Sequence, residues 1–509
     1  MIILGKEPLT ETHIRDIVFG KKKIRMDEHS MAGIKKNFAF LQSFNRDKII
    51  YGINTGFGPM ARYKIMEEDQ MDLQYNLIRS HAAGSGPAIS MEFTRASLLA
   101  RLSSLLQGHS GIHPEVVERL ADFLNLEIYP VIPEHGGVGA SGDLVQLSHL
   151  ALALIGEGEV FYRGEKRPAK AVLDECGLDP VSMHMREGLA LINGTAVMTG
   201  IGIVNLVKAR QLMHWSALAS SLINELVESY DDHFSVELNG FKKHPGQKHI
   251  ASLMRKYMEG SSRVRSRADH LYNGYRRKEW NNDKVQEFYS LRCVPQVLGP
   301  VSDTLEYALA VIVNEFNSVN DNPVIDEANG NVLHGGNFHG DYISLEMDKV
   351  KMAITKVSML AERQLNYLMN DKLNEKWPPF VNLGKPGLNL GMQGVQFTAT
   401  STVAENQVLS NPVYVHSIPN NNDNQDIVSM GANAALMTAR VIRNSYEVMA
   451  IEWMALLQAV DYLGCDKQLS GVSGKIYREM RTLVPRFEED TTKYKEIERI
   501  KNYLLGQDV

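Results

Sequence analysis

The sequence is poor in the features that mark secreted, membrane-spanning and nucleic-acid-binding proteins. It has only three cysteines in 509 residues, and their odd number and wide spacing argue against a disulfide framework or a cysteine-rich metal site. The net charge is -6, so no basic field favours nucleic acid or an anionic membrane. The chain has no run of about 18 apolar residues, and no basic segment precedes an apolar core at its start. We therefore expect a cytoplasmic protein that does not span a membrane.

Helical periodicity dominates what the sequence does contain. Ser90 can cap a helix whose leucines share one face until Gly108 ends it. Helical patterns also extend over residues 197–230, 343–371 and 432–463, and the second of these contains no glycine or proline. A helix of about 30 residues is about 45 Å long, which is more than one compact domain requires. The apolar faces of these helices therefore predict a bundle shared between subunits.

These patterns predict a mainly α-helical protein with two domains. We expect an N-terminal domain at residues 1–200, which includes a glycine-rich stretch, and a central helical bundle with C-terminal helices at residues 201–509. Residues 241–284 are polar and contain Pro245, Gly246 and several arginines. We expect a surface excursion with a mobile loop in that segment.

The glycine-rich stretch EHGGVGASGDLVQLSHL, at residues 134–150, is compatible with two chemistries. Its glycines formally match a dinucleotide-binding fingerprint, which would place a phosphate at the start of the following helix. That fingerprint needs a preceding strand, but Pro130 and Pro133 interrupt the run before it. It also needs a second parallel strand, whereas residues 157–164 have the pattern of a hairpin. The fingerprint is therefore weak.

The second chemistry is autocatalytic cyclisation of Ala140, Ser141 and Gly142. In a compressed turn, the Gly142 amide nitrogen can attack the Ala140 carbonyl carbon and close a five-membered ring. Loss of water, including the Ser141 hydroxyl, then leaves a dehydroalanine within an imidazolone. Ala140 and Gly142 hinder the attack least, and the neighbouring glycines let the backbone store strain. The product would be an electrophile that no ordinary side chain provides.

Four blocks of sequence together resemble the aromatic amino-acid ammonia-lyase and aminomutase family. The overall sequence is most similar to bacterial tyrosine ammonia-lyases. Two shorter segments lie between them, and the resemblance covers nearly the whole chain. It implies a fumarase/aspartase-like architecture, a homotetramer with shared active sites, and a 4-methylidene-imidazol-5-one formed from the triad, with no dissociable cofactor. The blocks are YGINTGFG at 51–58, GGVGASGDL at 136–144, YSLRCVPQ at 289–296 and NNDNQDIVSMG at 421–431, with LINGTA at 191–196 and GGNFHG at 335–340.

The resemblance also implies roles for individual residues. Tyr51 would be the base that removes the β-proton, so the site must favour its phenolate. Arg292 would clamp the substrate carboxylate with its planar fork, unless it forms a structural ion pair. Asp143 would either help the cyclisation or place negative charge at a helix start. The remaining expected site residues surround the electrophile and the substrate; they are Asn193 and Tyr289 near the triad, Phe338 against its ring, and Gly58, Ser80, His81, Asn322, Asn421 and Gln425 in the lining.

Substrate choice rests on two signals that conflict. In the family, the pair at Ser80 and His81 contacts the substrate ring, and this combination is typical of histidine enzymes. Histidine lyases have a glutamate at the position of Gln425, however, and a neutral amide suits an uncharged ring. His81 can also hydrogen-bond a phenol hydroxyl. We therefore expect L-tyrosine to be converted to trans-4-coumarate and ammonia, with histidine, which gives urocanate, as the alternative.

Three further classes of protein share some of these sequence features. A tyrosine aminomutase would use the same electrophile and return ammonia to the β-carbon. A non-catalytic protein on a retained scaffold is disfavoured, because Tyr51, the intact triad and Arg292 would have no reason to coexist. A metal hydrolase is disfavoured too, since His334 and His339 have poor spacing for a metal site. We expect a small aromatic amino acid as ligand and no metal, nucleic acid or membrane.

Overall fold

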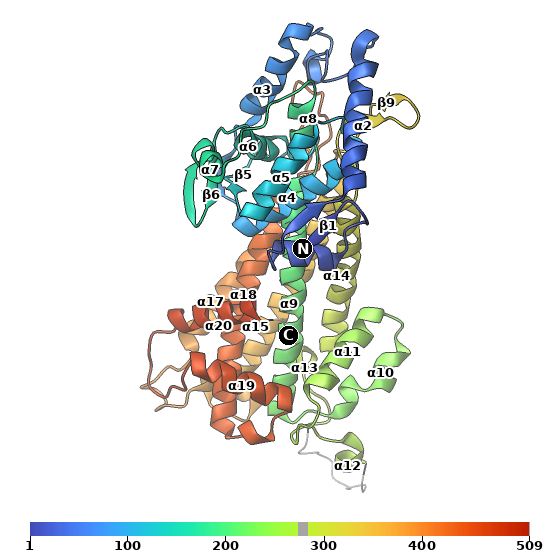
Figure 1. The fold of residues 1–509 in the computed structure, drawn as a ribbon. Coiled ribbons are helices and arrows are strands. Elements are labelled where there is room, and N and C mark those ends of the chain that lie inside the picture. Colours follow the sequence, from blue (N-terminus) through green and yellow to red (C-terminus); the bar gives the residue numbers. More distant parts are fainter. Residues whose placement is uncertain (273–283, 508–509) are drawn as a thin grey trace. The chain divides into compact units, whose positions relative to one another are not determined.

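A computed structural model describes residues 1–272 and 284–507, and most of them lie in helices (Figure 1). The expected mainly α-helical class is confirmed. Two compact units are interleaved in the sequence: unit 1 comprises residues 1–205, 308–348 and 412–438, and unit 2 comprises residues 206–307, 349–411 and 439–509. The expected division after residue 200 falls inside helix α9 (Ala196–Val227) and stays a prediction.

The first segment of unit 1 forms helices around a small parallel strand pair, β1 (Ile2–Leu4) and β2 (Ile24–Met26). The helix expected between Ser90 and Gly108 is confirmed as α4, because the Ser90 hydroxyl accepts a hydrogen bond from the Phe93 amide at 3.2 Å. Gly108 follows the helix with φ +74. The helices of this segment are α1 (Glu11–Val18), α2 (Glu28–Phe44), α3 (Gln70–His81), α4 (Met91–Leu106) and α5 (Pro114–Leu126).

Short antiparallel strands flank the glycine-rich stretch. The expected hairpin is confirmed as β6 (Glu159–Tyr162) and β7 (Glu165–Pro168), which turn at Arg163 and Gly164 with positive φ. The strand directly before the stretch, β5, is antiparallel to β3, so the parallel strands of a dinucleotide site do not occur around it. The other elements here are β3 (Ser85–Ala88), β4 (Tyr129–Pro130), β5 (Pro133–His135), α6 (Leu144–Leu154), α7 (Ala169–Cys176) and α8 (Glu187–Ile192).

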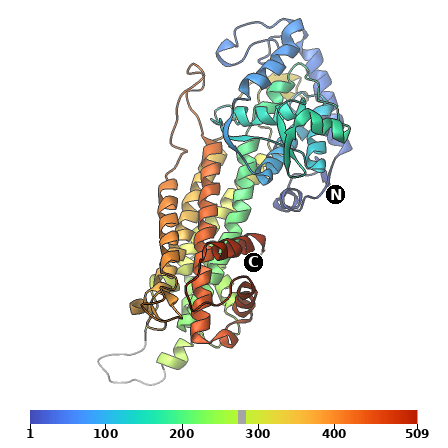
Figure 2. The same ribbon diagram turned by 90° about the vertical axis from the view of Figure 1, so that its left-hand side faces the viewer.

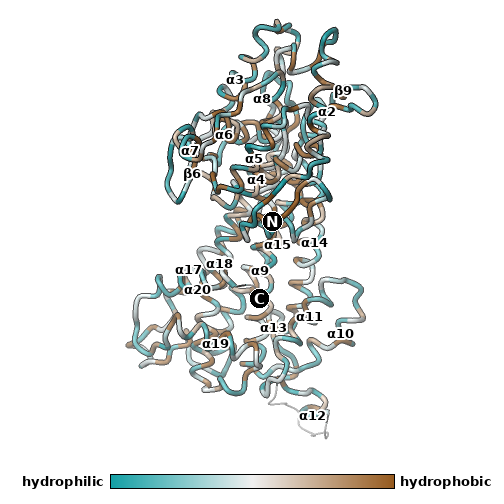
Figure 3. The backbone as a smooth tube through the Cα atoms, viewed as in Figure 1, coloured by the Kyte–Doolittle hydropathy of each residue, from teal (hydrophilic) through white to brown (hydrophobic). Residues whose placement is uncertain are grey.

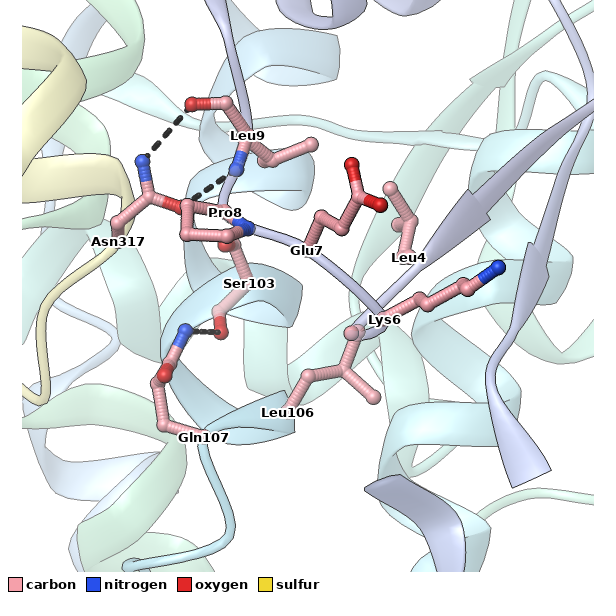
Figure 4. A pocket seen from close by; sticks show the side chains of 10 residues that line it. Leu4, Lys6, Glu7, Pro8, Leu9, Ser103, Leu106, Gln107 and Asn317 are labelled. Atoms are coloured by element: carbon pink, nitrogen blue, oxygen red, sulfur yellow. Dashed lines mark hydrogen bonds between the residues drawn. The ribbon is translucent and has the colours of Figure 1, made fainter. Parts of the chain in front are cut away.

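Segments distant in sequence complete the core of unit 1. Ile325 in β8 (Val324–Asp326), which pairs with β9 (Asn331–Leu333), packs into a buried cluster with Leu41 of α2. Asn317 holds the N-terminal segment by donating to the Leu9 carbonyl at 2.9 Å and accepting from the Leu9 amide at 2.7 Å (Figure 4). These bonds border a small cavity of about 140 Å³.

Long helices form unit 2, and the expected helical stretches are confirmed. Residues 197–230 correspond to α9, residues 343–371 to α15 (Asp341–Met369), and residues 432–463 to α18 (Gly431–Leu463). Asn406 of α17 (Gln393–Leu409) donates to Ser358 of α15 at 3.2 Å and to Ser445 of α18 at 3.1 Å. These three helices lie alongside one another in Figure 2. The remaining helices with residues in unit 2 include α14 (Val294–Phe316), whose last residues belong to unit 1, α16 (Asp371–Asn374), α19 (Gly471–Leu483) and α20 (Tyr494–Gly506).

The loop expected within residues 241–284 is wrong for part of that segment. Residues 245–257 form α11 (Pro245–Tyr257), which buries Ile250 and Met254. Pro245 stands in the first turn, where its missing amide hydrogen costs nothing, so it begins a helix instead of breaking one. The structure also contains α10 (Val236–Phe241), α12 (Arg267–Leu271) and α13 (Tyr289–Arg292), while residues 273–283 lie outside the described part of the chain.

Polar and apolar residues are interspersed along the helices of both units (Figure 3). Within residues 1–272 and 284–507, none of the helices combines the length and apolar character that crossing a membrane requires. Apolar faces are instead buried inside each unit, as the edge-to-face pair of Trp215 and Trp453 in unit 2 illustrates.

Candidate active site

The triad lies in a turn whose backbone leaves room only for glycine at two positions. Gly142 has φ +71, and a Cβ atom there would lie 2.0 Å from the Gly194 carbonyl oxygen. Gly139 has φ +79, and a Cβ atom there would lie 2.0 Å from the Ser429 hydroxyl. The Asp143 amide donates to Gly194 O at 2.8 Å. The glycine pattern therefore reflects close backbone packing, which holds the turn in a conformation that most residues adopt only under strain.

The atoms around the triad fit its conversion to the imidazolone. Among the residues that the structure describes, the Gly142 amide donates no hydrogen bond, so its nitrogen is not tied to another acceptor. The Asn193 side chain donates to the Ser141 carbonyl at 3.1 Å, and this oxygen would remain as the ring carbonyl. Gln425 donates to the Ser141 hydroxyl, the group that must leave, at 3.0 Å. The Asn193 donor withdraws electrons from the carbonyl that the cyclised group keeps, and the Gln425 donor assists departure of the hydroxyl.

The Asp143 side chain accepts hydrogen bonds at the start of a helix, but this is not the helix α6 that directly follows Asp143. Its carboxylate accepts from the amides of Val197 and Met198, at 2.8 and 2.9 Å, at the start of α9. Burial raises the pKa of Asp143 to about 7 even though these two hydrogen bonds favour the ionised form. The expected role of negative charge at a helix start is therefore seen at α9. A contribution of Asp143 to cyclisation stays a prediction.

A buried polar network supports the turn that contains Asn193. Gly194 has φ +151, and a Cβ atom there would lie 2.2 Å from the Arg101 guanidinium. Arg101 donates to Asn320 at 3.1 Å, and Asn320 donates to Thr195 at 3.0 Å. Burial lowers the pKa of Arg101 to about 10. Because these hydrogen bonds form in a low-dielectric interior, they hold the turn in place.

The phenol oxygen of Tyr51 receives a hydrogen bond from the loop that contains it. The Gly58 amide donates to that oxygen at 3.0 Å, and the Tyr51 ring packs edge-on against Phe57. Gly52 and Gly58 both have positive φ, so the loop needs glycine to fold back on the ring. An amide donor aimed at the phenol oxygen stabilises negative charge on it, as a general base requires.

One cavity of unit 1, of about 540 Å³, brings most of the expected site residues together. It contains the expected base Tyr51 and the triad serine Ser141. It also contains Ser80 and His81, the selectivity pair, which the family resemblance places against the substrate ring. No aspartate, glutamate, lysine or arginine is among its lining residues in the described part of the chain. The lining consists of Tyr51, Phe57, Gly58, Met60, Ala61, Leu73, Asn76, Leu77, Ser80, His81, Ser141, Leu144, Leu189, Asn193, Asn322, Phe338, Asn421, Asn424 and Gln425.

The hydrogen bonds of His81 fix its tautomer when its ring is neutral. Its Nδ1 lies 3.0 Å from the Leu77 carbonyl oxygen, which can only accept, so Nδ1 must bear the proton. The Ser80 hydroxyl donates to the same carbonyl at 3.1 Å and can accept from Nδ1 at 3.1 Å. The other ring nitrogen, Nε2, is therefore an acceptor in a neutral His81.

Tyr289 and Arg292 do not line this cavity. They lie on α13 in unit 2, where they border a separate cavity of about 680 Å³, and Tyr289 is 72% exposed. The Arg292 guanidinium lies 4.8 Å from the centre of the Tyr289 ring. No carboxylate in the described residues forms an ion pair with Arg292, so the structural ion pair is not seen there. The roles expected for both residues stay predictions.

Several lining residues had no signal of their own in the sequence. Asn424 lies in the block at residues 421–431, where nothing distinguishes it from the neighbouring asparagines. Asn76 precedes the selectivity pair by one helical turn. Met60 and Leu73 look like ordinary apolar residues in sequence. Helical spacing from Ser80 and His81 could have indicated Asn76 and Leu73, because residues three to four apart share a helix face.

Comparison with known proteins identifies the family. The model of the aromatic amino acid lyases matches residues 9–482. The histidine ammonia-lyase of Bacillus subtilis (strain 168) is 40% identical, covering 99% of this chain and 96% of its own. The tyrosine 2,3-aminomutase of Myxococcus sp. (strain Mx-B0) is 39% identical, covering 96% and 94%. The crystal structure of a tyrosine aminomutase from Streptomyces globisporus matches with a TM-score of 0.95 at 37% identity, covering 99% and 96%.

These findings confirm the resemblance of the sequence blocks and the self-formed prosthetic group that it implies. The triad that forms this group is Ala140, Ser141 and Gly142, whose surroundings fit the cyclised ring. The match extends over nearly the whole length of the relatives, so it includes the triad turn and the segments that line the cavity. The chain belongs to the aromatic amino acid lyase family.

Proposed function

We propose that this lyase eliminates ammonia from L-tyrosine to give trans-4-coumarate. The observation that supports tyrosine is a cavity lined by no aspartate, glutamate, lysine or arginine, whose lining includes His81 with Nε2 as an acceptor when the ring is neutral. A phenol hydroxyl can donate to that nitrogen, and the uncharged ring needs no carboxylate. Phenylalanine would leave the nitrogen unpaired, at a cost of about 1–3 kcal/mol.

The residues of the cavity have distinct parts in this proposal. The 4-methylidene-imidazol-5-one supplies an electrophilic carbon that makes the amine a better leaving group. Tyr51 removes the β-proton, and the Gly58 amide stabilises the charge on its oxygen. Asn193 holds the Ser141 carbonyl oxygen. Phe338 presses on the ring of the prosthetic group, while polar side chains orient the substrate; these are Asn322, Asn421 and Gln425.

The substrate carboxylate needs a cation that the cavity of unit 1 does not contain. We propose that Arg292, together with Tyr289, supplies it from a neighbouring subunit of a homotetramer. The family resemblance supports this assembly, as do the exposure of Tyr289 and the lack of an ion-pair partner for Arg292 among the described residues. A guanidinium that is not already paired can bind a carboxylate with two hydrogen bonds.

Histidine elimination to urocanate is the second candidate. Ser80 and His81 form the pair that the family resemblance associates with histidine, and relatives named histidine ammonia-lyase are 37–40% identical. Relatives named tyrosine 2,3-aminomutase are equally similar, at 38–40%, so β-tyrosine is a third possible product. The named relatives favour these two alternatives more than tyrosine elimination, whereas the uncharged cavity favours tyrosine over histidine.

The test is to supply the purified enzyme with tyrosine, histidine and phenylalanine separately. Ammonia release and the ultraviolet absorbance of the conjugated acid would be followed, with chiral chromatography for β-tyrosine. Dominant 4-coumarate is the expected result. Dominant urocanate would mean that Ser80 and His81 decide the selectivity, and accumulation of β-tyrosine with little free ammonia would assign an aminomutase.

A cytoplasmic location stays a prediction from the few dispersed cysteines.

A further inference from the structure

A single buried amide joins three segments that contain site residues. Gln74 lies on α3, the helix that ends with the selectivity pair, and its side chain is completely buried. Its Nε2 donates to the Gly52 carbonyl at 3.1 Å, and its Oε1 accepts from the Leu189 amide at 3.1 Å. Gly52 follows Tyr51 directly, and Leu189 lies on α8, which ends at Asn193. Both polar ends of Gln74 are thus satisfied by site segments.

Close packing keeps these three segments from sliding past one another. A Cβ atom on Gly52 would lie 2.5 Å from the Leu189 side chain, and one on Gly188 would lie 2.6 Å from the Gln74 carbonyl oxygen. The Gly52 amide is also held, because it donates to the Thr55 hydroxyl at 3.1 Å. The residue next to Tyr51 therefore has a partner for its amide and another for its carbonyl, and Gln74 is the one that lies on another helix.

We propose that Gln74 is a positioning residue for the elimination: it sets the Tyr51 oxygen at the distance from Asn193 and the electrophile that proton removal requires. Gln74 does not line the cavity, so it acts through Tyr51 and α8 rather than on the substrate. The inference rests on the proposed ammonia-lyase function. Its physical basis is that a displacement of about 1 Å at a reacting group can cost about a hundredfold in rate.

Asn37 offers a matched control, because its side-chain amide also joins two backbone segments elsewhere in unit 1. Its Nδ2 donates to the Ile325 carbonyl at 3.2 Å, and its Oδ1 accepts from the Gly111 amide at 2.9 Å. It is also buried, at 2% exposure. None of the residues that it joins lines the cavity of about 540 Å³. Gln74→Met and Asn37→Leu both replace a clamping amide with an apolar side chain of similar size.

The experiment compares both variants with the wild-type enzyme on the preferred amino acid, with and without deuterium at the β-carbon. Rates are normalised to the fraction of protein that intact mass shows to be dehydrated at the triad. For Gln74→Met we expect kcat to fall about tenfold to a hundredfold, KM to change little, and the deuterium isotope effect on kcat to increase. For Asn37→Leu we expect lower thermal stability with kcat and the isotope effect unchanged.

A third variant separates positioning from packing through pH. In Gln74→Glu the side chain can donate to the Gly52 carbonyl only while protonated, so its activity relative to wild type should fall as the pH rises. If this ratio stayed constant with pH, the hydrogen bond to Gly52 would not matter for the reaction. Equal losses of kcat in Gln74→Met and Asn37→Leu, with no change of isotope effect in either, would reduce Gln74 to a packing residue and overturn the proposal.

Failure of the ammonia-lyase activity on which the inference rests would look different. The wild-type enzyme would then release ammonia from none of the aromatic amino acids, and the role of Gln74 would be judged by amide hydrogen exchange. Gln74→Met must accelerate exchange at residues 52–58 and Asn37→Leu must not. Equal exchange in the two variants would overturn the anchoring itself.

Discussion

The two cavities that contain the expected catalytic residues differ in charge. The cavity of unit 1 contains the electrophile turn and Tyr51 without any acidic or basic side chain other than His81. The cavity of unit 2 contains Lys284, Arg292 and Arg363, with Glu287 as its acidic residue. The neutral wall suits the uncharged ring of an aromatic substrate, and the cationic wall suits a carboxylate. Under the proposed function, this difference assigns the chemistry and the binding of the acid group to separate parts of the chain.

The largest effect is expected from removing the electrophile from the neutral cavity. Ser141→Ala has no hydroxyl to eliminate, so the variant should lose nearly all activity, by several orders of magnitude. Its fold should persist, because the turn is held by Gly139 and Gly142 rather than by the serine. Turnover and intact mass are the measurements. Unchanged turnover would contradict the mechanism, and so would an intact mass showing that the Ser141→Ala protein is still dehydrated.

The next effect separates a binding arginine from a structural one. Arg292→Met should raise KM and lower kcat/KM by about a hundredfold or more while leaving the melting temperature unchanged. Arg186 in unit 1 is the contrast, because it is fully buried with Asp321 at 3.2 Å. Arg186→Met should cost about 3–5 kcal/mol of stability, since the buried Asp321 loses its nearer cation and keeps only Arg101, at 3.9 Å. A large loss of stability in Arg292→Met would make that residue structural after all.

Gln425→Glu tests whether the neutral wall selects the substrate. It introduces a negative charge into an uncharged cavity and removes the amide that donates to Ser141. We expect tyrosine turnover to fall about tenfold, by roughly 1.4 kcal/mol, and the ratio of histidine to tyrosine turnover to rise. Steady-state kinetics on both amino acids give the answer. Improved tyrosine turnover would contradict our account of the pocket.

The smallest effect concerns a buried carboxyl group without a partner among the described residues of unit 2. Glu225 accepts hydrogen bonds from the Ser470 amide and two hydroxyls, whereas neither carboxyl oxygen of Glu452 has a partner among the described residues. Burial raises the pKa of Glu452 well above its usual value, so the folded state keeps the proton. The unfolded state releases it above the usual glutamate pKa, and stability therefore falls as the pH rises through that value.

Glu452→Gln removes this dependence while keeping the shape of the side chain. We expect a melting temperature higher by about 1–2 °C near pH 8 and no difference near pH 4. Differential scanning calorimetry at the two pH values is the measurement. A variant that melts lower at both would show that the carboxyl group has a stabilising partner.

Sequence reasoning was most successful where local backbone demands are strict. The glycines around the triad and the Ser90 cap left clear patterns, because few residues satisfy φ near +70 or an unpaired helix amide. The clamping role of Gln74 left none, since its partner Leu189 is 115 residues away. Pro245 was misleading because proline both breaks and begins helices. The assignment of Asn322, Phe338 and Gln425 to unit 1 could not be predicted either, because the chain passes between the units several times.

The central claim is that Tyr51 and Arg292 act in one site but come from different subunits. Mixing Tyr51→Phe with Arg292→Met subunits, after unfolding and refolding them together, tests it most directly. Each parent alone should be nearly inactive. Mixed tetramers should recover up to about a quarter of wild-type activity, because each position is intact in half of the subunits. If one chain supplied both residues, every site would retain a defect, and mixtures as inactive as their parents would contradict the account.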